Sequence, residues 1–242
     1  MIKIGKAVLG KSPAIAITLA DSESLHLIQK AKRTVGTYCD TPLLLEIRID
    51  RFRKLKIDSI ISRLQLLRRA KLPLIATVRS RKEGGRRFIP EAKRLELFQA
   101  VLPHVDAIDV ELSSPHLIKT LVPLAKRKGK RTILSYHHFK ATPPDAQLIR
   151  LIQKGKKRGA DIVKIAVTPQ RSGDVGRLLL LTKRFRGKGL ITIAMGPLGR
   201  ASRILAPLFG SALTYTFIRK PQAPGQIPLG KLSKQLRAFF QL

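Results

Sequence analysis

The sequence is short of several residue types, and each shortage excludes a class of protein. Cys39 is the only cysteine among 242 residues, so no intrachain disulfide can form and the fold must rest on a hydrophobic core. Tryptophan is absent and aromatic residues make up 5% of the chain, which leaves few side chains for stacking nucleic-acid bases. No apolar run reaches the length of a membrane span, and residues 1–11 are unlike a signal peptide, so we expect a cytoplasmic protein.

Acidic residues are also scarce: 15 Asp and Glu stand against 48 Lys and Arg, which gives a net charge of +33. The excess runs along the whole chain, whereas nucleic-acid binders more often concentrate it in one face, arm or tail. The pattern therefore also resembles a supercharged surface, of natural or engineered origin. Either origin predicts non-specific binding to nucleic acid. Five of the few acids lie at or just beyond predicted strand ends: Glu46, Asp50, Glu83, Asp109 and Glu111.

Apolar β-type runs alternate with helical patterns along the chain. The predicted strands are Ala14–Leu19, Leu43–Ile49, Leu74–Val78, Ala107–Val110, Thr132–Tyr136, Ile162–Val167, Leu190–Ala194 and Ala212–Tyr215. The predicted helices are Ser59–Ala70, Pro90–Leu102, Pro115–Lys128, Asp145–Arg158, Val175–Phe185 and Gly230–Phe240. Near-continuous apolar strands that alternate with helices indicate parallel pairing with both sheet faces covered.

Eight such units in about this length favour an α/β fold of one domain, residues 1–242, built as a (β/α)₈ TIM barrel. Residues 1–11 are expected to form a short strand or hairpin that covers the barrel floor. An open doubly wound sheet is the alternative, but no Gly-x-Gly-x-x-Gly motif follows the first strand.

Three basic clusters each precede a predicted strand: Lys126–Gly129, Lys156–Gly159 and Arg186–Gly189. Cations at a helix C-terminus complement the helix dipole, and the closing glycine supplies a left-handed cap. No aromatic residue interleaves these clusters, so we interpret them as structural helix ends rather than as a nucleic-acid footprint.

Lys164 lies in the middle of the apolar strand Ile162–Val167. An amine in that position must be desolvated or paired, and desolvation or nearby cations lower an amine's pKa and free it to attack a carbonyl. The alternative is an ordinary lysine whose ammonium group reaches water past the strand end. The rest of the chain favours the nucleophile.

In a (β/α)₈ barrel the chemistry belongs at the C-terminal ends of the strands, and the polar residues there form a coherent set. Besides Lys164 they are Glu46, Arg48, Asp50, Arg79, Glu83, Asp109, Glu111, His137, His138, Arg200, Arg203 and Gln226. Taken singly, Glu46 and Arg48 could form a buried ion pair, and His137 could be a core histidine. Together they predict a lysine nucleophile, a histidine base, arginines and glutamates around one mouth. No cluster has metal-ligand spacing and no phosphate loop is present.

These residues carry a resemblance to a known family. The chain resembles the type I 3-dehydroquinate dehydratases, lyases of the shikimate pathway, over essentially its whole length. The matching motifs, in chain order, are Glu46-x-Arg48-x-Asp50, Arg79-Ser80-x-x-Glu83-Gly84-Gly85, His137-x-Phe139, Lys164-Ile165-Ala166-Val167, Ser202-Arg203, Phe209-Gly210-Ser211-Ala212 and Ala223-Pro224-Gly225-Gln226.

The resemblance implies a role for each site residue. Lys164 would form a Schiff base with the ketone of 3-dehydroquinate, and His137 would act as base and then as acid. Glu83 would orient His137, and Arg203 would bind the substrate carboxylate. The remaining expected substrate contacts are Glu46, Arg48, Arg79, Gln226 from a closing loop, and the apolar Met195 and Phe139. No metal or organic cofactor is implied. The family is often dimeric, although like charges would oppose association here.

Two positions depart from the family pattern. His138 stands where an aspartate commonly follows the catalytic histidine, and Gln222 stands where a serine usually lies four residues before the loop glutamine. We expect Gln222 either to bond the substrate carboxylate or to hinder loop closure. Two other functions stay open: an aldolase-type Schiff-base barrel that binds phosphate through residues 195–199, and a catalytically idle basic barrel that binds nucleic acid.

Overall fold

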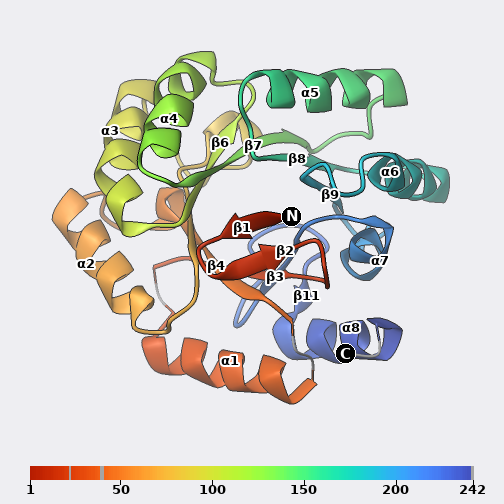
Figure 1. The fold of residues 1–242 in the computed structure, drawn as a ribbon, viewed down its shortest axis with the longest axis horizontal. Coiled ribbons are helices and arrows are strands. Elements are labelled where there is room, and N and C mark those ends of the chain that lie inside the picture. The colour runs from red at the N-terminus through yellow and green to blue at the C-terminus, as the bar shows by residue number, and fades with distance from the viewer. Residues whose placement is uncertain (22, 39–40, 241–242) are drawn as a thin grey trace.

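The computed structural model describes residues 1–21, 23–38 and 41–240 and places them in a ring of parallel strands enclosed by helices (Figure 1). Its strands are β1 Ile2–Ile4, β2 Ala7–Leu9, β3 Ile15–Leu19, β4 Leu43–Arg48, β5 Leu74–Thr77, β6 Ala107–Glu111, β7 Arg131–His138, β8 Ile162–Val167, β9 Leu190–Ala194, β10 Thr214–Phe217 and β11 Ile227–Pro228. Its α-helices are α1 Leu25–Tyr38, α2 Ile57–Arg68, α3 Glu91–Val101, α4 Pro115–Arg127, α5 Asp145–Lys157, α6 Ser172–Arg184, α7 Ser202–Phe209 and α8 Leu229–Phe240. Cys39 lies outside the described residues.

The strands pair in chain order, from β10 beside β3 through to β9, and β11 adds to the outer side of β10. Every pairing in this sheet is parallel. The predicted TIM-barrel architecture is therefore confirmed, and the order shows none of the reversal that an open doubly wound sheet requires.

The seam between β9 and β10 differs from the other pairings. No ladder joins these two strands in the described ranges; instead, the amide of Ala212 donates to the carbonyl of Leu190 over 2.8 Å, and Ser211 Oγ accepts from the amide of Thr192 over 3.1 Å. The prediction that the last strand spans Ala212–Tyr215 was wrong by two residues at each end. The strand begins at Thr214 because residues 211 and 212 make single bonds rather than a ladder, and it continues to Phe217 because it still pairs with β11 there.

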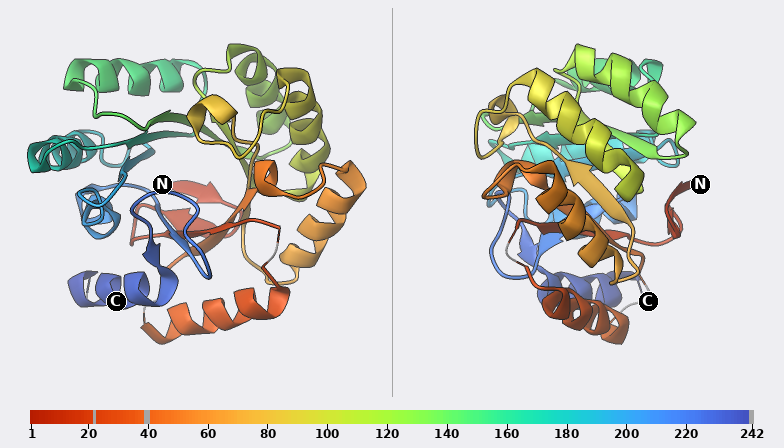
Figure 2. Two further views of the ribbon diagram at one scale, coloured as in Figure 1. Left: turned by 180° about the vertical axis from the view of Figure 1, so that it is seen from behind. Right: turned by 90° about the vertical axis from the view of Figure 1, so that its left-hand side faces the viewer.

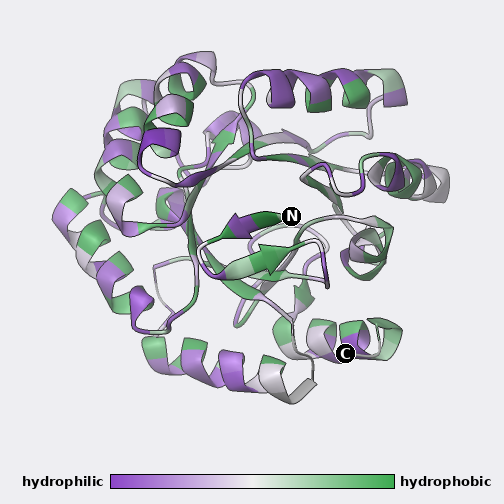
Figure 3. Ribbon diagram, in the orientation of Figure 1, coloured by the Kyte–Doolittle hydropathy of each residue, from purple (hydrophilic) through white to green (hydrophobic). Residues whose placement is uncertain are grey.

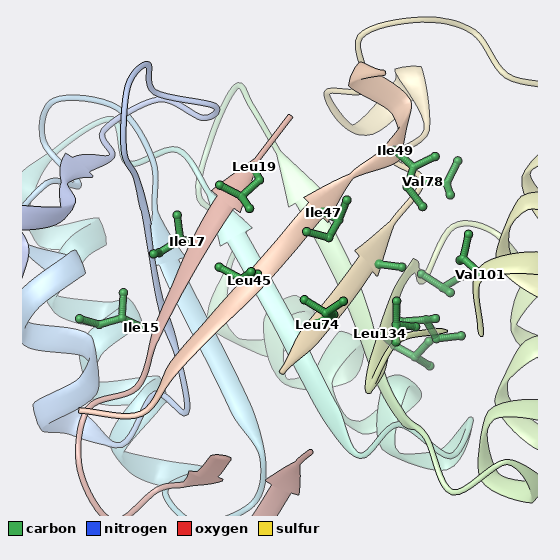
Figure 4. Packing of buried hydrophobic residues seen from close by; sticks show 14 of the residues in the cluster. Ile15, Ile17, Leu19, Leu45, Ile47, Ile49, Leu74, Val78, Val101 and Leu134 are labelled. Carbon is green, nitrogen blue, oxygen red and sulfur yellow. The ribbon is translucent and has the colours of Figure 1, made fainter. Parts of the chain in front are cut away.

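Two apolar layers lie on opposite sides of the strands. One set of alternate strand residues, including Ile15, Ile17, Leu45, Ile47 and Leu74, faces outward and packs beneath the helices (Figure 4). Figure 3 shows the polar residues of those helices on their outer faces. The other set faces inward and forms the floor of the barrel: Ala16, Leu44, Ile75, Ala107, Ile133, Ile162, Ile191 and Leu213.

The predicted hairpin over the floor is confirmed. β1 and β2 pair antiparallel, and Ile4, Ala7 and Leu9 join the inward-facing cluster at the floor. The side view shows this hairpin at one end of the ring (Figure 2). The hairpin thus covers the floor end of the barrel, opposite the end where the parallel strands finish.

The basic clusters lie where the dipole argument places them. Each follows or ends a helix, and the glycines Gly129, Gly159 and Gly187 have φ of 65°, 85° and 75°, the left-handed region that caps a helix. Within the described residues, no helix is long and apolar enough to cross a membrane.

Candidate active site

The barrel interior changes from apolar to polar within one layer of side chains. Two residues beyond the floor layer on successive strands, the inward-facing positions are Thr18, Glu46, Thr77, Asp109, Ser135, Lys164, Ile193 and Tyr215. The period of two along a strand brings these residues to one level at the mouth. Five of them, Thr18, Glu46, Lys164, Ile193 and Tyr215, line a pocket with about 670 Å³ of empty space.

All eleven side chains expected at the site line this one pocket: Lys164, His137, Glu83, Glu46, Arg48, Arg79, Arg203, Gln226, Met195, Phe139 and Gln222. Phe139 is 43% exposed at the rim, where its ring stacks on that of His137 with centroids 6.5 Å apart. The structure brings these side chains together in one pocket, and their individual chemical roles stay predictions.

Lys164 is 4% exposed, and its Nζ contacts two carboxylates. Asp109 Oδ2 lies 3.0 Å away and Glu46 Oε1 lies 3.4 Å away. The same Nζ lies 4.1 Å from the centroid of the Tyr215 ring, a cation–π distance. Lys164 is thus paired and buried at the centre of the pocket, and the alternative of a lysine that reaches solvent is wrong.

Arg79 and Asp109 hold the centre of the charge network. Arg79 lies 3.0 Å from Asp109 and 3.2 Å from Glu111, and it donates to Ser135 Oγ over 2.7 Å. Burial alone opposes ionisation of Asp109, yet Arg79 and Lys164 lower the pKa of its carboxyl. Asp109 therefore stays an anion beside Lys164 at neutral pH.

His137 and Glu83 face the same pocket. His137 Nδ1 lies 3.0 Å from Glu83 Oε2, which also accepts the backbone amide of His137 over 2.9 Å. Burial, followed by the charges of Arg79 and Lys164, lowers the pKa of His137 well below its usual value. Burial raises the pKa of Glu83 to about 7, against an opposing hydrogen bond that Ser113 donates over 2.5 Å.

This pairing assigns the two nitrogens of His137. With the imidazole neutral, Nδ1–H donates to Glu83 and Nε2 keeps a free lone pair, which is the form that a general base needs. The neighbouring His138 does not line the pocket, and its Nδ1 lies 3.0 Å from both the amide and the carbonyl of Ala141. The geometry therefore selects His137 over His138.

Glu46 and Arg48 do not form the ion pair that their spacing on one strand allowed. Arg48 instead makes two 2.9 Å bonds to Asp50, while Glu46 accepts from Thr18 over 2.9 Å and from Thr77 over 3.2 Å. Two positions apart on a strand, both face inward, but the 3-10 turn Ile49–Arg51 brings Asp50 back toward Arg48. Glu46 can therefore pair with Lys164 instead.

Arg203 lies opposite this network and has spare hydrogen-bonding capacity. It is 2% exposed, its Nη2 donates to the carbonyl of Pro224 over 3.0 Å, and its Nε is buried without a partner in the part of the chain described. Burial lowers the pKa of Arg203 to about 10, so the guanidinium still carries its charge at neutral pH. A buried cation with an unused donor suits a carboxylate ligand.

Comparison with known proteins decides the family. Residues 15–242 match the family model for type I 3-dehydroquinase. The 3-dehydroquinate dehydratase of Aquifex aeolicus is 35% identical over 229 residues, which cover 94% of this chain and 99% of that protein. The chain belongs to the type I 3-dehydroquinases.

Other members agree in sequence and in structure. The 3-dehydroquinate dehydratase of Methanococcoides burtonii is 35% identical and covers 98% of each chain. The crystal structure of the Geobacillus kaustophilus dehydratase has a TM-score of 0.88 at 30% identity and covers 99% of this chain and 96% of that one. This type I 3-dehydroquinase therefore has the length and barrel of its family.

Sequence reasoning missed several residues of the pocket. Thr18, Arg51 and Tyr215 line the pocket but were not singled out, and Asp109, which contacts Lys164, was singled out as a strand-end acid without a role. The inward period of two would have found Thr18 and Tyr215, since each lies two residues beyond a floor residue. Arg51 carried no such signal in a chain with 48 basic residues.

Proposed function

We propose that this chain dehydrates 3-dehydroquinate to 3-dehydroshikimate through a Schiff base on Lys164. The single observation that carries the proposal is the buried Lys164 Nζ, 3.0 Å from Asp109, in the same pocket as the His137–Glu83 pair. Family membership supplies the substrate class and does not favour the aldolase-type alternative.

The pocket supports each step of this reaction. The amine of Lys164, having given up its ammonium proton, adds to the ketone carbon, and uptake of one proton with loss of water leaves a protonated imine beside Asp109 and Glu46. His137 Nε2 removes a proton from the carbon next to the imine, and the electron pair moves toward the nitrogen. The imidazolium then gives that proton to the departing hydroxyl, which leaves as water. Hydrolysis of the imine releases the product and frees Lys164.

Charge supports the assignment of the binding groups. Arg203 has an unused Nε donor and would bind the substrate carboxylate. Arg48 and Arg79 are held by carboxylates, so they would position the ring hydroxyls together with Glu46. Gln226, Met195 and Phe139 would complete the walls, with Gln222 at the loop. Every group in this scheme is a side chain, and no metal or organic cofactor has a part in it.

The basic exterior would act separately from the pocket. We expect it to draw the anionic substrate toward the protein, to bind nucleic acid without sequence preference, and to weaken association into a homodimer by like-charge repulsion. All three effects are expected to diminish as salt screens the charge.

Ultraviolet absorbance of purified protein mixed with 3-dehydroquinate tests the proposal. A rise in absorbance of the conjugated enone, proportional to enzyme, supports the dehydratase. A flat trace from folded protein would reject it and favour the catalytically idle basic barrel.

A further inference from the structure

Residues 218–226 join β10 to β11 and form part of the pocket wall. We call them the mouth loop. Gln222, Ala223, Pro224 and Gln226 from this loop line the pocket. A substrate that fills the pocket would therefore contact the mouth loop, so whatever holds the loop influences how the substrate binds.

The mouth loop is braced from within. Gln226 Oε1 accepts the amides of Gln222 and Ala223 over 2.6 and 3.2 Å, and Gln226 Nε2 donates to Thr18 Oγ1 over 3.3 Å. Gly225 has a φ of 75°, and a Cβ there would lie 2.5 Å from the carbonyl oxygen of Gly196. These contacts give the loop a defined shape and seat one end of it against β3 and the residues after β9.

Two guanidinium groups tether the loop from outside it. Arg203 binds the Pro224 carbonyl, and Arg51 Nη2 donates to the Gln222 carbonyl over 2.9 Å. Arg203 is also expected to bind the substrate carboxylate, so its donors are shared between the loop and the substrate. Arg51 lies 171 residues from Gln222 and ends the 3-10 turn after β4, the strand that carries Glu46 and Arg48. This hydrogen bond therefore joins the mouth loop directly to the segment that follows β4.

The environment of Arg51 suits it to hold the mouth loop in place. Burial first, and then the charge of Arg48, lowers the pKa of Arg51 below its usual value, against the opposing charges of Asp50 and Glu46. Its Nε and the Oε1 of Gln222 are both buried without a hydrogen bond among the described residues. The bond between Arg51 Nη2 and the Gln222 carbonyl gives this half-buried cation an acceptor on the loop.

We propose that Arg51 is a positioning residue that latches the mouth loop over the pocket through the backbone carbonyl of Gln222, and thereby sets the affinity for the substrate. The affinity part of this proposal rests on the function proposed above, whereas the latch itself does not.

Hydrogen exchange tests the latch in the free protein. Exchange measured by mass spectrometry on peptides that span residues 218–226 should be several-fold faster in Arg51→Gln than in the unchanged protein. Arg51→Lys, which keeps a donor, should give an intermediate rate. Arg87→Gln is the matched control, because Arg87 also donates to backbone carbonyls near the mouth, those of Phe52 and Arg53, but not to the loop. Thermal melting of each variant shows that the barrel remains folded.

Kinetics test the consequence for substrate. Loss of one charge-assisted hydrogen bond to the loop predicts a rise in KM of about tenfold in Arg51→Gln. The kcat should change by less than about threefold, and Arg87→Gln should match the unchanged protein. Arg51 does not touch Lys164 or His137 in any contact described, so a loss confined to kcat would contradict a latch.

The exchange and kinetic experiments test the latch and the proposed function separately. If the unchanged protein does not turn over 3-dehydroquinate, the proposed function fails, and the exchange rates still decide whether Arg51 holds the loop. Unchanged loop exchange in a folded Arg51→Gln protein would overturn the latch whatever the activity. Faster exchange with an unchanged KM would overturn its link to affinity.

Discussion

The mouth of the barrel and the outer surface use charge in opposite ways. Within the described residues, seven acidic and five basic side chains are buried. In the whole sequence, by contrast, basic residues outnumber acidic ones 48 to 15. Apart from Arg51 and Arg203, whose Nε atoms have no partner among the described residues, charges at the mouth are matched and hydrogen-bonded, as Asp109 is by Arg79, Lys164 and Ser135. The exterior carries the excess.

This contrast has an energetic cause. A buried charge without a partner costs several kcal/mol, so the interior composition is constrained however basic the chain becomes. An exposed lysine keeps its hydration and changes stability by a few tenths of a kcal/mol. We infer that chemistry resides in the matched interior set, and that the exterior governs encounter and non-specific binding. The following predictions test that division.

Removal of the central amine should give the largest effect. Lys164→Ala is expected to lower kcat by about 10⁴-fold or more, because no imine can form, while the barrel stays folded since Asp109 keeps Arg79. Steady-state kinetics and a melting curve measure the two expectations. Appreciable turnover in a folded Lys164→Ala protein would remove the central role of this residue.

His137→Gln should separate proton transfer from imine formation. The expected loss in kcat is about 10²- to 10⁴-fold, the usual contribution of a general base, while Lys164 still condenses with the ketone. Borohydride reduction in the presence of 3-dehydroquinate should therefore trap an adduct in this variant. A small loss in kcat would show that another group removes the proton.

The pH dependence of kcat/KM tests the pair formed by His137 and Glu83. The pKa of Glu83 is raised to about 7 and that of His137 is lowered well below its usual value, so the first proton taken up as pH falls binds to the pair near pH 7. The protonated pair is a poor base, and kcat/KM should fall as pH drops through about 7.

Glu83→Gln sharpens that expectation. Without the carboxylate, the acid limb should move to lower pH, since only the depressed His137 titrates, and kcat should fall by about tenfold to 100-fold because the imidazolium loses its partner. Profiles recorded between about pH 5 and 9 would decide. An unmoved acid limb would assign it to a different group.

Neutralising an exterior cluster should give the smallest effect on chemistry. The triple variant Lys126→Gln, Arg127→Gln, Lys128→Gln is expected to leave kcat within about twofold of the unchanged protein, since none of these residues at the C-terminal end of α4 lines the pocket. Its affinity for single-stranded DNA, read by fluorescence anisotropy across a salt series, should weaken with a shallower salt slope. A large fall in kcat would break the division between interior and exterior.

Much of the fold was predictable because the strands are continuous apolar runs. Strands β8 and β9 match their predicted bounds, Ile162–Val167 and Leu190–Ala194, without error. Helix α1 and the two-residue strand β11 were not predicted, since α1 has no acidic residue in its first turn and β11 exists only by pairing with β10, and no bounds were predicted for α7. The β9–β10 seam depends on single contacts that leave no sequence pattern.

The site was predictable in its membership but not in its pairings. Motifs and strand-end positions brought all eleven expected residues to the pocket. That Glu46 and Asp109 both reach Lys164 depends on barrel closure and strand register, because these residues come from β4, β6 and β8. Local spacing instead suggested that Glu46 and Arg48 pair with each other. In the structure Arg48 pairs with Asp50, which the 3-10 turn brings close to it.

Peptide mass spectrometry after borohydride reduction tests the central claim most directly. The protein would be reduced in the presence of 3-dehydroquinate, digested and compared with a sample reduced without substrate. We predict one adduct, on the peptide that contains Lys164, and none on the many exterior lysines. Enzymatic turnover with no adduct on Lys164, or with an adduct on a different lysine, would contradict the account.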